Sequence, residues 1–120
     1  MYKRQGITEV ALKEHVADKT NWRKMLKNDF EEENLVAWQE RLRNFIPDEV
    51  KEYFIEDNKE TVINFPVSQY PEKPKSLNIV KQQSYKGKLV GIKGQYFIFE
   101  DNTVFNVRAN EGLVVTIKVL

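Results

Sequence analysis

Residues 87–108 read GKLVGIKGQYFIFEDNTVFNVR, and this stretch decides the fold class. Apolar and polar side chains alternate along it, as they do in half-buried strands. The alternation predicts four short strands, near 87–93, 95–100, 103–109 and 113–119. Turn-forming residues separate these strands: Gly94, Asp101-Asn102 and Glu111-Gly112. Strands at such short spacing favour an antiparallel meander, and a small SH3-type barrel would be its curled form.

The segment upstream of this stretch predicts extended chain. Residues Thr61 to Val67 alternate and predict one more strand. The connector SQYPEKPKS (68–76) contains Pro71 and Pro74, which lack a backbone donor and favour an extended conformation.

The first half of the chain has the spacing of helices. Apolar residues recur three and four positions apart from Ile7 to about Ala17, in a short helix with Trp22, Met25 and Leu26, and in a third helix that Asp29 could cap. Pro47 ends the third helix and starts a fourth, with Val50, Tyr53 and Phe54 facing inward. The chain is therefore predicted to be α+β, with N-terminal helices followed by the β meander. The expected core is Trp38, Leu42, Phe45, Ile98, Val107, Val115 and Ile117.

Length and composition are those of a small globular protein. The chain has 120 residues and a mass of 14.2 kDa, with 41% hydrophobic and 31% charged residues, which allows one domain or two small lobes. No apolar run reaches the roughly 20 residues of a membrane span. No apolar segment of a signal peptide follows the first residues, so a cytoplasmic location is expected. Cysteine is absent, which excludes disulfides and Cys-based zinc sites within these residues.

Positive charge concentrates in the second half of the chain. Residues 1–60 carry 11 Lys or Arg against 14 Asp or Glu, whereas residues 61–120 carry 8 against 4. The excess comes from a stripe of six lysines that faces only Glu72: Lys73, Lys75, Lys81, Lys86, Lys88 and Lys93. Such a stripe could bind nucleic acid phosphates. The alternative is a solvated sheet edge, because exposed lysines discourage pairing with another edge.

No catalytic residue is identified by the sequence itself. His15 is the single histidine, and a lone imidazole at a helix end is more often a packing or surface residue than a ligand. The serines have no histidine near them in a triad-like arrangement. The glycines of GIKGQY precede a strand rather than a helix, so a bulge or turn explains them better than a phosphate loop.

Three stretches carry a resemblance to a known family: TEVALKEHVADKTNWRKMLKN, INFPVSQYPEKPKSLNI and GKLVGIKGQYFIFEDNTVFNVR. Together they resemble the C-terminal part of a bacterial domain-of-unknown-function family common in Bacteroidetes-type genomes. Full-length members look about twice as long, with an early four-cysteine zinc-type cluster and a central segment similar to the GIY-YIG nuclease fold. The resemblance therefore implies zinc upstream of this chain.

The GIY-YIG resemblance implies one metal ligand here. In such domains two strand motifs supply tyrosines, one helix an arginine, and a later helix the glutamate that binds a divalent metal such as Mg²⁺. TEVALKEH resembles that glutamate helix and places Glu9 at the metal-ligand position. The tyrosine and arginine partners would lie upstream of residue 6. Since one carboxylate cannot hold and use the metal alone, residues 6–120 are expected to be inactive by themselves.

The first five residues, MYKRQ, have an expected origin outside the gene. The codons GTG TAT AAG AGA CAG, at the end of a transposase mosaic-end adapter, translate to these residues when GTG is read as a start. The alternative is a native start with the same sequence. The expected organisation is therefore 1–5 adapter-derived, 6–60 the helical end of a truncated metagenomic domain, and 61–120 a β module. MYKRQ should pack poorly or merely extend the first helix.

Two functions remain open from the sequence. The parent protein is a GIY-YIG-related, metal-dependent nuclease or a degenerate relative of one. Alternatively, the chain is a non-catalytic module whose β half and lysine stripe bind nucleic acid or protein. An intact set of tyrosine and arginine motifs upstream would favour the nuclease.

Overall fold

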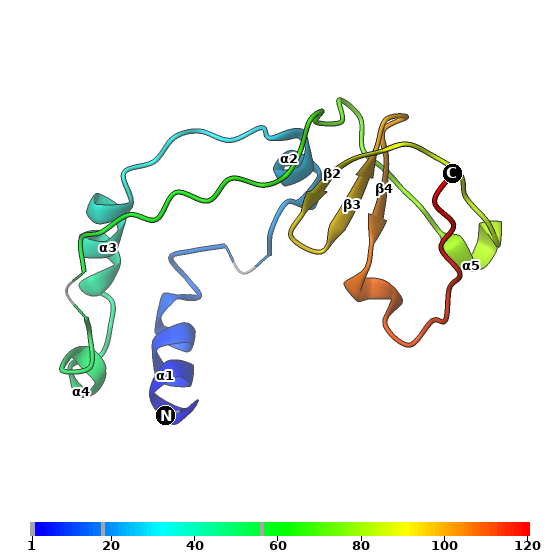
Figure 1. Cartoon of the computed structure of the whole chain (residues 1–120). Helices are drawn as coiled ribbons and strands as arrows, with labels where there is room; N and C mark the ends of the chain where they lie inside the picture. Colours follow the sequence, from blue (N-terminus) through cyan, green and yellow to red (C-terminus); the bar gives the residue numbers. More distant parts are fainter. Residues whose placement is uncertain (1, 18, 56) are drawn as a thin grey trace. The chain divides into compact units, whose positions relative to one another are not determined.

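The computed structural model describes residues 2–17, 19–55 and 57–120, with helices first and most of the sheet last (Figure 1). The helices are α1 (Tyr2–Leu12), α2 (Trp22–Lys27), α3 (Leu35–Arg43), α4 (Asp48–Lys51), α5 (Ile79–Gln82) and the 3₁₀ helix η1 (Arg108–Asn110). The strands are β1 (Lys75–Ser76), β2 (Leu89–Lys93), β3 (Tyr96–Phe99) and β4 (Thr103–Asn106). The predicted α+β class is confirmed.

The strands form one mixed sheet in the order β1-β4-β3-β2. β2, β3 and β4 are antiparallel neighbours, as the meander prediction required. β1 was not predicted and pairs parallel with β4, with Lys75 opposite Thr103. Its position is fixed by two backbone bonds of 2.9 Å, from Lys75 N–H to the Asn102 carbonyl and from Leu77 N–H to the Val104 carbonyl.

Two predicted strands, 61–67 and 113–119, are absent from the sheet in the described part of the chain. The contacts at the two edges of the sheet show which residues lie there. Segment 61–67 contributes only an isolated bridge between Val67 and Gly91. Ser68 N–H donates to the Val90 carbonyl and Ile92 N–H to the Pro66 carbonyl, so this short segment closes the β2 edge. β1 occupies the edge of β4 on which a fourth meander strand was expected, and segment 113–119 forms no strand.

The predicted burial of three C-terminal residues is accordingly wrong. Val107 is 43% exposed, Val115 51% and Ile117 75%. β4 ends at Asn106 because its side-chain oxygen accepts a hydrogen bond from Ala109 N–H at 3.0 Å, which starts η1. The 3₁₀ helix η1 and the helix α5 both lie within residues 61–120, the expected β module. The expectation that this module consists mainly of strands is therefore wrong.

The chain divides into two compact units that do not follow chain order. Unit 1 contains Met1–Asn21 and Phe30–Ile63, and unit 2 contains Trp22–Asp29 and Asn64–Leu120. The expected β module, residues 61–120, is thus joined by α2 from early in the sequence.

Unit 2 has a closed core between α2 and the sheet. Leu26 and Ile98 are fully buried and Val104 is 1% exposed. Trp22 packs against this cluster, and its ring stacks on that of Tyr96 with centroids 6.1 Å apart. The predicted inward face of α2 and the predicted burial of Ile98 are both confirmed.

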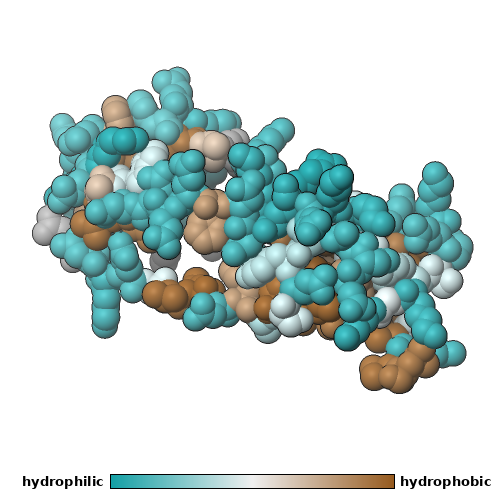
Figure 2. Space-filling view, turned by 90° about the horizontal axis from the view of Figure 1, so that it is seen from above, coloured by the Kyte–Doolittle hydropathy of each residue, from teal (hydrophilic) through white to brown (hydrophobic). Residues whose placement is uncertain are grey.

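Unit 1 buries much less. Its most buried apolar residues are Ile46 at 9% and Val50 at 6% exposure. Of the expected core residues, Trp38 and Leu42 are half-buried, while Phe45 is 43% exposed and does not belong to a core. Figure 2 shows apolar side chains among the hydrophilic ones on the face that it presents.

Helix starts in unit 1 differ from those expected. α3 begins at Leu35 because the Asn34 side chain accepts a hydrogen bond from Ala37 N–H at 3.1 Å, and not at Asp29. Glu31, Glu32 and Glu33 precede the helix as a result. Pro47 lies directly before α4, at its N-cap.

α1 includes four of the five MYKRQ residues, which extend the first helix as expected. The Arg4 guanidinium lies 3.6 Å from the centre of the Tyr53 ring. The side chain of Tyr2 and all of Met1 lie outside the described residues. Val10 is 72% exposed and Ile7 half-buried, so part of the apolar side of α1 faces solvent.

Candidate functional site

Four of the six predicted lysines belong to two segments that lie against the turn joining β3 to β4. Lys73 and Lys75 come from the connector before α5, and Lys86 and Lys88 come from the segment before β2. We call them the turn lysines. All four side chains are exposed.

The connector is held against the turn by one residue, Asn102. Its carbonyl accepts the hydrogen bond from Lys75 N–H, and its side-chain oxygen accepts one from Glu72 N–H at 3.1 Å. Asn102 has a φ of 69°, a left-handed conformation that asparagine tolerates better than most residues. The connector bearing Lys73 and Lys75 therefore runs along the turn.

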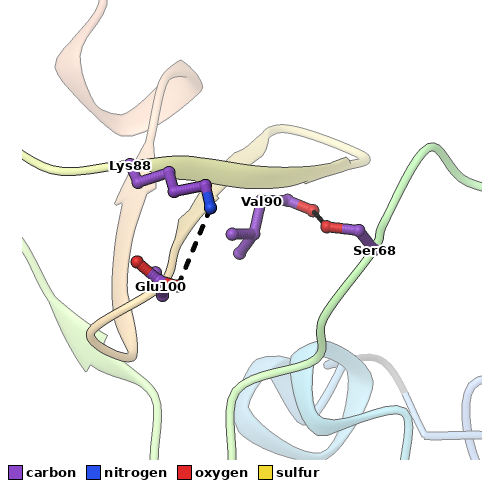
Figure 3. A network of polar contacts seen from close by, with 4 residues as sticks. All are labelled: Ser68, Lys88, Val90 and Glu100. Carbon is purple, nitrogen blue, oxygen red and sulfur yellow. Dashed lines mark hydrogen bonds and ion pairs between the residues drawn. The ribbon is translucent and has the colours of Figure 1, made fainter.

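The segment before β2 reaches the same turn from the other side. Glu100 N–H donates to the Lys88 carbonyl at 2.9 Å, and the Lys88 ammonium lies 3.9 Å from the Glu100 carboxylate (Figure 3). The Tyr85 hydroxyl donates to Asp101 Oδ1 at 2.8 Å, and its ring meets Phe99 edge-on at 4.9 Å. Figure 1 shows this segment crossing β4 and β3 near their turn on its way from α5 to β2.

Carboxylates at the turn are engaged by neighbours. The hydrogen bond from Tyr85 lowers the pKa of Asp101, and the nearby Lys75 charge acts in the same direction. Thr103 N–H also donates to Asp101, at 3.0 Å. Burial raises the pKa of the Tyr85 phenol, so it stays a hydrogen-bond donor. The turn lysines thus stand beside acids that are already bound within the protein.

Lys81 and Lys93 differ from the turn lysines. Lys81 is exposed on α5, whose first turn is capped by Asn78. Lys93 is only 8% exposed, because its ammonium donates to the Met25 carbonyl at 2.9 Å and to the Asn28 side chain at 3.4 Å. Lys93 is therefore not part of an exposed stripe but ties α2 to the sheet.

Sequence reasoning missed Tyr85 and Asn102, which position the turn lysines. The Asp101-Asn102 turn was recognised, but its contacts with chain segments far away in sequence were not. The position of Lys93 had a signal in the alternation of β2, since Lys93 falls on the same side of the strand as Gly91.

Glu9, the predicted metal ligand, lies exposed on α1. It lines a shallow groove of unit 1 with Val10, Lys13 and Leu42. Within 2–17, 19–55 and 57–120, no group of three or more His, Cys, Asp or Glu side chains is placed to hold a metal ion. His15 lies beyond the end of α1 and stacks on Phe45, with ring centroids 3.6 Å apart.

Comparisons with known proteins give one match. The sequence model of a family described as "Protein of unknown function (DUF2797)" matches residues 2–115. No curated protein and no solved structure matches the chain. As for membranes, no helix in the part of the chain that the structure describes has both the length and the apolar character to cross one.

Proposed function

The chain belongs to the DUF2797 family, and we propose that its unit 2 is a nucleic-acid-binding module. The turn lysines are its phosphate-binding residues. One observation carries the proposal: the two segments that bear these four lysines, on either side of α5, are both hydrogen-bonded to a single turn. The hydrogen bonds to Asn102, Glu100 and Asp101 hold them there.

The chemistry of the turn lysines fits a phosphate backbone. An ammonium group on a flexible stem binds phosphate as a point charge and needs no fixed orientation. Binding of this kind releases counterions and weakens steeply as the salt concentration rises. It also makes no use of base sequence, so the module would bind many sequences alike.

The test measures binding of the full chain to a fluorescently labelled oligonucleotide by anisotropy at several salt concentrations. A variant with Lys73→Gln, Lys75→Gln and Lys86→Gln should bind more weakly and lose about 1 unit of salt slope per lysine. A control with Lys3→Gln, Lys19→Gln and Lys59→Gln removes the same charge from unit 1. Equal losses in both variants would contradict the proposal, because net charge and not the turn would then explain the binding.

A second candidate function is a metal-dependent nuclease of the GIY-YIG type, in a longer protein. Glu9 supports it, because TEVALKEH resembles the glutamate helix of GIY-YIG domains and Glu9 is exposed on α1. Cleavage also requires a positioned nucleophile and groups that stabilise charge on the phosphate. The tyrosines and arginine that would supply them lie upstream of residue 6 in the hypothesis.

This candidate is tested by incubating the chain with labelled single- and double-stranded DNA and Mg²⁺ or Mn²⁺. We expect no metal-dependent cleavage, and we expect Glu9→Ala to remain folded by circular dichroism. Cleavage that requires the metal and disappears in Glu9→Ala would instead make Glu9 part of an active centre within this chain.

A further inference from the structure

The sheet of unit 2 has a second face that α2 does not cover. Side chains alternate between the two faces of a strand. Tyr96, Ile98 and Val104 belong to the core with Leu26 of α2. Phe97, Phe99 and Phe105 therefore point to the opposite face, and all three are half-buried.

Three apolar residues form a row across this opposite face. In the strand register, Ile92 of β2 lies opposite Phe97 of β3, and Phe97 lies opposite Phe105 of β4. The rings of Phe97 and Phe105 have centroids 6.3 Å apart and are tilted by 49°. Ile92 is 39% exposed, so the β2 end of the row is open to solvent.

Two of the turn lysines, Lys75 and Lys86, belong to segments that border the same face. Thr103 precedes Val104 in β4 and so shares the side of Phe105, and its partner in β1 is Lys75. Leu89 pairs with Phe99 and is 49% exposed, so it lies on this face, whereas Lys88 directly precedes it and points to the other side. Tyr85 packs edge-on against Phe99 and covers it, whereas no ring contact of this kind accompanies Phe97 and Phe105 beyond their own pair among the described residues. Lys75 thus borders the aromatic row, and Tyr85 brings the segment that carries Lys86 to the same face.

We infer that the nucleic acid bound by unit 2 is single-stranded, with bases stacked on Phe97 and Phe105 and phosphates held by Lys75 and Lys86. This inference rests on the proposed function and narrows its ligand. A flat aromatic ring offers a surface on which any unpaired base can stack, and the neighbouring positive charge complements the backbone that connects the bases. The bases of a duplex are stacked on one another and cannot lie on the sheet.

The test compares three labelled probes of about 15 nucleotides, near the upper end of site sizes for small single-strand-binding domains. They are a single strand, its blunt duplex, and an abasic strand with the same phosphates. The single strand should bind at least about tenfold more tightly than the abasic strand, the effect of losing one or two stacked bases. This comparison requires no change to the protein.

Two variants then locate the contact. Phe97→Leu keeps an apolar side chain but removes the ring, and should weaken single-strand binding by about tenfold without changing binding of the abasic strand. Phe30→Leu is the matched control, because Phe30 belongs to unit 1 and is 66% exposed. Near-UV circular dichroism reports whether Phe97→Leu keeps its fold.

The outcomes separate the inference from the proposed function. If the single and abasic strands bind equally, stacking does not occur and the inference is wrong, even where substitution of the turn lysines still weakens both. Tighter binding of the duplex than of the single strand also overturns it. Failure of every probe to bind at low salt overturns the proposed function itself.

Discussion

Unit 1 and unit 2 contain similar kinds of apolar residues but bury them very differently. Unit 2 closes a core in which Leu26, Ile98 and Val104 are at most 1% exposed. In unit 1 no described residue falls below the 6% exposure of Val50, and Leu35 remains 58% exposed on α3. Each unit contains one tryptophan, Trp22 in unit 2 and Trp38 in unit 1, so fluorescence can follow both.

The difference comes from the elements available in each unit. A sheet presents several apolar side chains on one flat face, and α2 covers that face with one turn and a half of helix. In the described part of unit 1 the regular elements are helices, of which α4 has only 4 residues. A helix of that length is marginal by itself and depends on packing for its stability. An apolar stripe in the sequence therefore predicts burial only where a covering surface exists.

The largest expected contrast comes from the same truncation in each unit. Leu26→Ala removes a fully buried side chain and should cost about 2–5 kcal/mol of unfolding free energy. Leu35→Ala, at an exposed position, should change it by less than about 0.5 kcal/mol. Urea denaturation followed by tryptophan fluorescence measures both. Similar costs would show that the closed core of unit 2 is not its main source of stability.

A second pair substitutes alanine for glycine. A Cβ on Gly91 would lie 2.8 Å from a methyl group of Val67 and 3.0 Å from its Cα, so Gly91→Ala should destabilise unit 2 by about 1–3 kcal/mol. At Gly6, inside α1, a Cβ meets nothing within 4 Å. Gly6→Ala should stabilise α1 by about 0.5–1 kcal/mol because alanine favours helix. The measured quantity is the denaturation midpoint, and shifts of the same sign would refute the packing of Val67 on Gly91.

A third pair compares lysines within unit 2. Lys93→Met keeps an apolar stem but leaves the Met25 carbonyl without its ammonium donor, which should cost about 1 kcal/mol. Lys88→Met breaks an exposed ion pair of 3.9 Å and should change stability by less than about 0.5 kcal/mol. Thermal denaturation distinguishes the two. A larger loss from Lys88→Met would mean that Lys93 does not anchor α2.

The smallest effect is the pH dependence of the turn. Because the Tyr85 hydrogen bond lowers the pKa of Asp101, its ionised carboxylate stabilises the fold above the ordinary value of 3.8, and this contribution is lost as the pH falls through the lowered value. The stability advantage of the wild-type chain over Asp101→Asn should shrink between about pH 5 and pH 2. Tyr85→Phe removes the donor and should weaken the pH dependence. A constant difference across this range would exclude a role for the charge.

The sequence predicted local patterns better than pairings between distant segments. The alternation around Tyr96 to Asn106 and the inward face of α2 were both read from neighbouring residues. The same alternation at 113–119 predicted a strand beside β4, but the local pattern contains no information about β1, which takes that position. α5 had a recognisable signal in Asn78, an effective cap, which the prolines of the preceding connector obscured.

At the candidate site, too, the sequence predicted local features better than contacts between distant segments. Counting charges found the turn lysines, since exposed lysines are plain in any sequence. Counting could not separate Lys93 from them, because its burial depends on the Met25 carbonyl, 68 positions away. Counting charges also could not find Asn102 and Tyr85. These two residues act by holding the lysine-bearing segments at the turn.

The position of α2 sets an order for folding. Its anchoring bond joins residues 68 apart, so α2 leaves the ribosome well before the strands it packs against are made. A helix of 6 residues is too short to persist alone, and its apolar side must remain solvated or transiently covered during that interval. Contacts this distant in sequence also slow folding, because a long loop must close before they form. Synthesis that stops before β2 would therefore leave Trp22, Met25 and Leu26 exposed to proteases and chaperones.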